Sequence, residues 1–193
     1  MRILQIAAIG VALAGLIGSG PANSQEFSQS SGGGLFSIFD EVRAGGSFSI
    51  QPDYDPGFVI RGELIFKSFV PPFDNYFANT LLRPRVHLGG NFGTGDGGIN
   101  QVFAGFTWNF PLPYNLFVEA TFGMTVHDGP LESATGIDLG CNVLFRESIG
   151  LGADIGEHWR VLAAVDHSSH AHLICDGGNS GITHAGAYVG YRF

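Results

Sequence analysis

The feature that most constrains this chain is a strict alternation of apolar and polar residues, which recurs in eight segments after residue 40. A period of two places successive side chains on opposite faces of an extended strand, so each segment predicts a β-strand with one apolar face. In the fifth segment, Val118, Ala120 and Phe122 share one face, whereas Glu119 and Thr121 share the other. The eight segments are residues 41–50, 58–67, 83–91, 101–110, 116–127, 138–151, 159–169 and 184–193.

Several segments are longer than the five or six residues usual in strands of soluble sheets, and about ten tilted residues cross a membrane. Only 13% of the residues are charged, which is too few to solvate an outer surface. The chain ends in Phe193 with Tyr191 two residues before it, which resembles the last strand of bacterial outer-membrane barrels. Because lipid forbids open sheet edges, we predict an all-β fold, an eight-stranded antiparallel transmembrane β-barrel of the bacterial outer membrane. The rival is a soluble calycin-like barrel, since alternation alone does not say which face points outward.

The polar faces of eight closed strands would meet in a narrow interior that side chains fill. We therefore expect an internal ion-pair network instead of an open pore. Its predicted members are Arg43, Arg61, Glu63, Arg85, Glu119, Arg146, Asp166 and Arg192.

An even number of strands predicts that both ends of the barrel chain lie in the periplasm. Four aromatic residues would then gather near the periplasmic interface of the membrane, namely Trp108, Phe110, Tyr114 and Trp159. The expected outer connections are residues 51–56, 92–98, 127–137 and 170–181, and the long connection 69–82 is not explained by strand rules.

The N-terminus is predicted to be an export signal. Arg2 precedes an apolar run over residues 3–17, and small residues then lead to a signal-peptidase site after Ser24. An N-terminal membrane anchor is the alternative. Export permits a disulfide between Cys141 and Cys175. The predicted parts are a secretory signal peptide (1–24) and a single barrel domain (25–193), made of a flexible lead (25–39) and the barrel (40–193).

The charge balance limits the partners of the chain. It carries nine Lys and Arg against 17 Asp and Glu, a formal net charge of -8. Phosphate contacts need a basic face, so we expect no nucleic-acid partner. Whether the barrel forms a homodimer stays open.

A candidate for chemistry lies at the outer end of the seventh segment. His167 and Ser169 are two residues apart and share the apolar face with Val161, Ala163 and Val165. Polar side chains on a lipid-facing wall cost desolvation energy, so they indicate function. An imidazole beside a hydroxyl is the core of an activated-serine esterase. The non-catalytic interpretation is that the two polar side chains are simply solvated at the rim of the barrel, at headgroup level.

Here the chain resembles the PagL-type lipid A 3-O-deacylase family, also called acyloxyacyl hydrolases. The family pattern is H-x-S-N-A, a short loop, N-x-G, an apolar residue, an acid and a closing strand that ends in an aromatic residue. The segment 144–148 also resembles the preceding strand of the family. The corresponding stretches are His167-Ser168-Ser169-His170-Ala171, Asn179-Ser180-Gly181-Ile182-Thr183 and Gly190-Tyr191-Arg192-Phe193.

The resemblance implies an integral outer-membrane esterase that needs no metal or other cofactor. Ser169 would be the nucleophile and His167 the base. The implied substrate is the ester-linked acyl chain at position 3 of lipid A, the membrane part of lipopolysaccharide. Lipid A and the surrounding outer-membrane lipids are therefore the expected partners.

Two positions depart from the family pattern. His170 stands where the family has an Asn. The resemblance implies that His170 and Ala171 lie near the oxyanion of the reaction, which a backbone N–H can still stabilise. Thr183 replaces the acid, and a hydroxyl does not hold an imidazolium as a carboxylate does. Asp176 is a candidate replacement acid, and Glu147 shares the outward parity. The alternatives are a weak enzyme, an enzyme with a changed specificity, and an inactive barrel with a structural or surface-interaction role.

A metal site is the competing hypothesis for the same region, because imidazole and thiolate groups bind zinc and copper. The spacing matches no standard site, and a paired cysteine would lose its thiolate, so we assign no metal. The residues concerned are His167, His170, His172, His184 and Cys175.

Overall fold

The structure is a computed structural model that describes residues 35–51, 57–133 and 136–193. The predicted signal peptide and most of the predicted lead lie outside these residues. A 3₁₀ helix, η1 (Leu35–Ile38), precedes the first strand, and an α-helix, α1 (Tyr76–Leu81), lies between the second and third. The strands are β1 (Phe39–Ser49), β2 (Phe58–Phe66), β3 (Arg85–Gly93), β4 (Gln101–Pro111), β5 (Leu116–His127), β6 (Val143–Ile155), β7 (Trp159–Ser169) and β8 (Ile182–Arg192).

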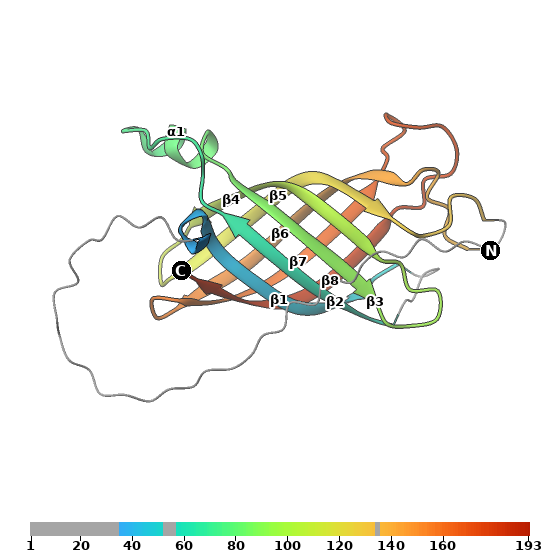
Figure 1. Cartoon of the computed structure of the whole chain (residues 1–193), viewed down its shortest axis with the longest axis horizontal. Coiled ribbons are helices and arrows are strands. Elements are labelled where there is room, and N and C mark those ends of the chain that lie inside the picture. Colours follow the sequence, from blue (N-terminus) through green and yellow to red (C-terminus); the bar gives the residue numbers. More distant parts are fainter. Residues whose placement is uncertain (1–34, 52–56, 134–135) are drawn as a thin grey trace. The chain divides into compact units, whose positions relative to one another are not determined.

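Each strand pairs antiparallel with the next, and β8 returns to β1, so the sheet closes (Figure 1). At the seam, Val42 lies opposite Tyr191 and Arg43 lies opposite Gly190. The predicted all-β, eight-stranded antiparallel barrel is therefore confirmed. No helix within the described ranges is long and apolar enough to cross a membrane.

The two ends of the barrel differ. We call the end with both barrel termini the turn end and the opposite end the loop end. The turn end carries connections 67–84, 112–115 and 156–158. The loop end carries the connections that follow β1, β3, β5 and β7, of which 94–100 and 170–181 are described in full.

The outer wall of the barrel is apolar and the interior is charged. Phe122 and Ile149 on the wall are 50% and 63% exposed, whereas Glu63 and Glu119 inside are buried. Such a wall is the reverse of a water-soluble barrel, and it suits a membrane, where apolar side chains face hydrocarbon. The soluble calycin-like alternative is therefore wrong.

The interior holds the predicted ion-pair network. Arg43 lies 2.6 Å from Glu119, 2.9 Å from Glu41 and 3.6 Å from Glu63. All four side chains are almost fully buried. Burial of these charges is tolerable only because they pair with one another.

A second group of the network lies nearer the loop end. Arg146 pairs with Asp166 at 2.8 Å, and Arg61 reaches the same carboxylate at 3.5 Å. One predicted member does not join the interior: Arg192 is at the rim, where its side chain is 41% exposed and pairs with Asp154. Because the last strand ends there, the side chain reaches solvent.

The sixth strand begins later than predicted. Alternation suggested residues 138–151, but β6 spans Val143–Ile155. Leu139 is fully buried in an apolar cluster with Leu144 and Ile182, instead of facing outward. The apolar residues before β6 therefore belong to a cap over the loop end, and they prolong the alternating pattern past the strand.

Candidate active site

The outward register of β7 creates the candidate site. His167 and Ser169 are partly exposed on the outer wall. Asp166, which precedes the pair, and Ser168, which separates its two members, are buried in the interior. The strand ends at Ser169, so the pair lies at the loop end of the barrel. The two side chains thus lie where the apolar wall meets the outer connections.

Strand β8 holds the imidazole of His167. Thr183 is the direct partner of His167 in the β7–β8 register, and its Oγ1 lies 2.8 Å from Nδ1 of the imidazole. The backbone N–H of Thr183 donates to the side chain of Gln51 at 2.7 Å, which fixes Thr183 in turn. The family acid position is therefore beside His167, but it offers a neutral hydroxyl.

The edge of the imidazole that does not contact Thr183 lies beside Gly181. A Cβ atom built on Gly181 would lie 2.7 Å from Cε1 and 3.2 Å from Nε2 of His167. The β7–β8 register, continued by one residue, puts Gly181 beside Ser169. No hydrogen bond joins Ser169 to His167 in the described part of the chain. Catalytic hydrogen bonds often tighten only when substrate binds.

Glu147 flanks His167 from the other side. The β6–β7 register pairs Glu147 with His167, and the side chain is exposed on the outer wall. Directly opposite residues have Cβ atoms about 5 Å apart, within reach of a carboxylate and an imidazole. A carboxylate on a lipid-facing wall indicates function. Sequence parity put Glu147 on this wall, but only the register shows that it neighbours His167.

Asp176 is placed differently. It is exposed in connection 170–181. Within the ranges that the structure describes, no ion pair or hydrogen bond joins its carboxylate to His167.

His170 holds the connection that follows Ser169. It is fully buried, its Nδ1 accepts the N–H of His172 at 3.2 Å, and its Nε2 lies 2.8 Å from the carbonyl of Gly178. These contacts require the proton on Nε2, which donates to Gly178. The backbone N–H of His170 donates to Asn179 at 3.1 Å. Both the ring and the N–H of His170 are therefore occupied in bracing the connection.

Ala171 is the other residue of the expected oxyanion neighbourhood. It is exposed and has a left-handed backbone, with φ of 51°. Residues other than glycine rarely adopt this conformation, which turns the backbone sharply just after β7. Its N–H has no hydrogen bond to any residue that the structure describes. A backbone donor near Ser169 is thus available for an anion.

A disulfide ties two outer connections together. Cys141 and Cys175 are bonded, with 6.4 Å between their Cα atoms. Beside it, the N–H of Ser180 donates to the carbonyl of Asp138 at 2.8 Å. The connection after Ser169 is therefore braced against the connection before β6.

The metal hypothesis finds no support in this geometry. His184 is buried in the interior, 3.7 Å from Asp166, whereas His167 is on the outer wall. Cys175 is in the disulfide. No group of three or more metal-binding side chains forms among the described residues.

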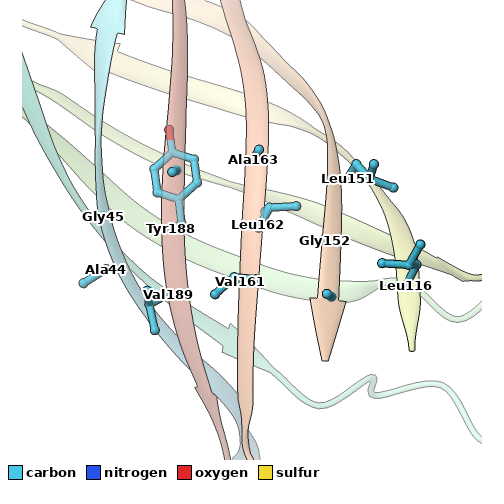
Figure 2. A pocket seen from close by; sticks show the side chains of 12 residues that line it. Ala44, Gly45, Leu116, Leu151, Gly152, Val161, Leu162, Ala163, Tyr188 and Val189 are labelled. Atoms are coloured by element: carbon cyan, nitrogen blue, oxygen red, sulfur yellow. The ribbon is translucent and has the colours of Figure 1, made fainter. Parts of the chain in front are cut away.

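An apolar depression of about 430 Å³ lies on the same wall, toward the turn end. Most of the residues that line it face outward. Figure 2 shows Ala44 on β1 and Val161 and Ala163 on β7, with β8 between these two strands. Small side chains here leave a hollow where a hydrocarbon chain fits. On β7, Ala163 is four residues from His167.

Known proteins resemble this chain in sequence and in fold. The family model of lipid A 3-O-deacylase (PagL) matches residues 73–192. The crystal structure of the outer membrane enzyme PagL superimposes with a TM-score of 0.60 at 20% identity, covering 79% of this chain and 99% of that one. The N-terminal β-barrel domain of Pseudomonas aeruginosa OprF gives 0.54 at 14% identity, covering 81% and 98%. No curated protein sequence matches the chain.

Proposed function

Because this chain belongs to the lipid A 3-O-deacylase (PagL) family, we propose that it hydrolyses the ester-linked acyl chain at position 3 of lipid A. It is an integral β-barrel of the outer membrane. Ser169 is the proposed nucleophile and His167 the proposed general base. The observation that supports the proposal is the outward placement of both residues at the loop end of the barrel.

The orientation follows from the even number of strands. Both barrel termini of such proteins lie in the periplasm, so the loop end faces the outside of the cell. Lipid A occupies the outer leaflet, and its ester bonds lie near the headgroup level. The reacting groups and the substrate are then at the same depth, and the acyl chain can lie along the apolar depression near Ala163.

The reaction proceeds by acyl transfer to Ser169. With Nδ1–H of His167 donating to Thr183, Nε2 is free to take the proton of Ser169 as Oγ attacks the ester carbonyl. The N–H of Ala171 donates to the resulting oxyanion. The carbon–oxygen bond to the sugar then breaks, and His167 returns the proton to the departing sugar oxygen. Water, deprotonated by His167, releases the fatty acid and restores Ser169.

A carboxylate to steady the protonated imidazole is the missing part of the family arrangement. Thr183 orients the ring but adds no negative charge. Glu147, opposite His167 on β6, is the best-placed carboxylate for that role, and we propose it in preference to Asp176. Because catalysis by such triads survives loss of the acid at a reduced rate, the replacement predicts a slow enzyme and not an inert one.

The second candidate is a catalytically inactive barrel with a surface role. The neutral Thr183 at the acid position favours it. It predicts that lipid A is left intact, which separates it from the deacylase.

Mass spectrometry of lipid A tests the proposal. Cells that express the chain should contain lipid A that lacks one 3-hydroxyacyl chain, and Ser169→Ala or His167→Ala should abolish this species. Ser168→Ala is the matched control, because Ser168 is the adjacent serine but is buried in the interior. It should deacylate like the wild type. Intact lipid A in cells with folded wild-type barrel would refute the deacylase proposal.

A further inference from the structure

We propose that the turn end carries a binding site for the phosphate headgroup of an anionic glycerophospholipid in the periplasmic leaflet. The site lies between connection 67–84 and the rims of β3 and β4. It uses none of the residues assigned to deacylation, so it depends on the membrane location of the barrel and not on its activity.

The site is a cavity of about 530 Å³ beneath α1, lined mostly by residues with polar or charged groups. Its basic lining comes from Lys67, Arg83 and Arg85, and its aromatic lining from Tyr76 and Trp108. This combination of cations with aromatic rings is suited to a lipid headgroup at a membrane interface.

The cations of this cavity are exceptional in the molecule. Among the described lysine and arginine side chains, only those of Lys67 and Arg83 have no ion pair to a carboxylate. Arg85, by contrast, pairs with Asp40 at 2.5 Å and with Glu119 at 3.5 Å. In an acidic protein, two unpaired cations on one cavity leave a local positive charge that an anion can neutralise.

Arg83 is held in place by neutral acceptors only. Its Nε donates to the carbonyl of Val70 at 2.7 Å, and its Nη1 donates to Asn79 at 3.2 Å. These bonds fix the guanidinium without cancelling its charge, and Nη2 donates to none of the described residues. A fixed, planar guanidinium binds phosphate oxygens well, and the exposed Lys67 adds a mobile charge.

The surface around the cavity is apolar. Phe69 and Phe77 are 73% and 72% exposed, and Leu81 and Leu82 are also exposed. Large apolar side chains gathered on one short segment mark an interaction surface.

The outer wall continues directly into this surface. Trp108 on β4 donates its indole N–H to the carbonyl of Leu81 at 2.9 Å, and α1 contacts β4 at the turn end (Figure 1). Because Trp108 belongs to the lipid-facing wall, the aromatic segment beside it meets the same bilayer. The occupant that fits both the apolar rim and the cations is a phospholipid.

Trp108 also supplies the reporter for a test. The chain has two tryptophans, so a Trp159→Phe background leaves Trp108 as the single emitter. The folded full-length barrel in phosphatidylcholine vesicles is supplemented with increasing phosphatidylglycerol. We expect a saturable change in Trp108 emission. Lys67→Gln with Arg83→Gln should weaken the apparent affinity about tenfold or more, since each cation near an anionic surface contributes several-fold.

The control variants distinguish binding at this site from non-specific electrostatic attraction between the protein and anionic lipid. Arg192→Gln removes a cation of the turn end that pairs with Asp154, and it should bind phosphatidylglycerol like the wild type. Phe77→Ser should weaken binding but keep the preference for phosphatidylglycerol over phosphatidylcholine. Gel mobility before and after heating verifies that each variant is folded.

Three results would overturn the proposal. The first is equal phosphatidylglycerol affinity for the double variant and the wild type. The second is the same emission change with added phosphatidylcholine alone. The third is complete competition by inorganic phosphate at the concentration of the lipid, which would identify a free-anion site.

Discussion

At the scale of single residues, His167 lies between two strands that offer it different partners. Thr183 on β8 hydrogen-bonds to the imidazole, and Glu147 on β6 is its other register neighbour. That His167 and Ser169 share the outer face of the barrel was predictable from parity. The position of Glu147 opposite His167 was not predictable, because the alternation of residues within one strand does not determine how that strand pairs with the next.

The acid position provides the first prediction. Thr183→Glu would put a carboxylate 16 residues after His167 and opposite it, and we expect deacylation to accelerate about tenfold or more. Glu147→Gln should slow the wild-type reaction about tenfold, because the protonated imidazole loses the carboxylate opposite it on β6. Initial rates of fatty-acid release from lipid A in detergent micelles measure both effects.

Asp176→Asn is the matched control for these variants, since it removes the same charge from an exposed position on the outer connection. Its rate should equal that of the wild type. A larger loss for Asp176→Asn than for Glu147→Gln would reverse the assignment of the acid.

At the scale of elements, the strands were largely predictable and the connections were not. Seven of the segments with alternation coincide with strands to within a few residues, but the sixth was wrong because Leu139 packs into the cap. The structural part played by His170 was also missed, since its partner is the carbonyl of Gly178. Backbone partners leave no signature in the residue types.

Gly181 provides the prediction at this scale, because it joins connection 170–181 to the imidazole. Its φ is +68°, and an added Cβ would press on the ring of His167. Gly181→Ala should therefore lower the deacylation rate about tenfold or more through displacement of the ring. Gly177→Ala is the matched control, since φ is +111° there but the nearest atom would be 3.9 Å away. Equal losses in both variants would show that backbone strain, and not contact with His167, is responsible.

At the scale of the whole molecule, the barrel combines an apolar outer wall with an interior of paired charges. The network spans the barrel because arginines on different strands share a carboxylate, as Arg61 and Arg146 share Asp166. Most of its members were predicted from strand parity and closure together, but Glu41 and Arg160 also join it and Arg192 does not. The pairing within it was not predictable, since closure brings together residues that are far apart in the sequence.

Removing a shared carboxylate should destabilise the barrel. Asp166→Asn leaves the buried Arg146 without its carboxylate partner and removes one of the two carboxylates that pair with Arg61, and we expect the free energy of unfolding to fall by about 3 kcal/mol. Arg192→Gln, at the half-exposed rim, should cost less than about 1 kcal/mol. Urea unfolding in lipid vesicles, followed by tryptophan emission, measures both. Equal costs would mean that the interior network contributes no more than a surface ion pair.

The central claim is that Ser169 is an activated nucleophile on the outside of the barrel. The most direct measurement is labelling of the folded protein with an alkyl fluorophosphonate, followed by mass spectrometry of its peptides. The account predicts one phosphonylated residue, Ser169, and no labelling in the His167→Ala variant. A folded wild-type barrel that stays unlabelled, or equal labelling after His167→Ala, would contradict it.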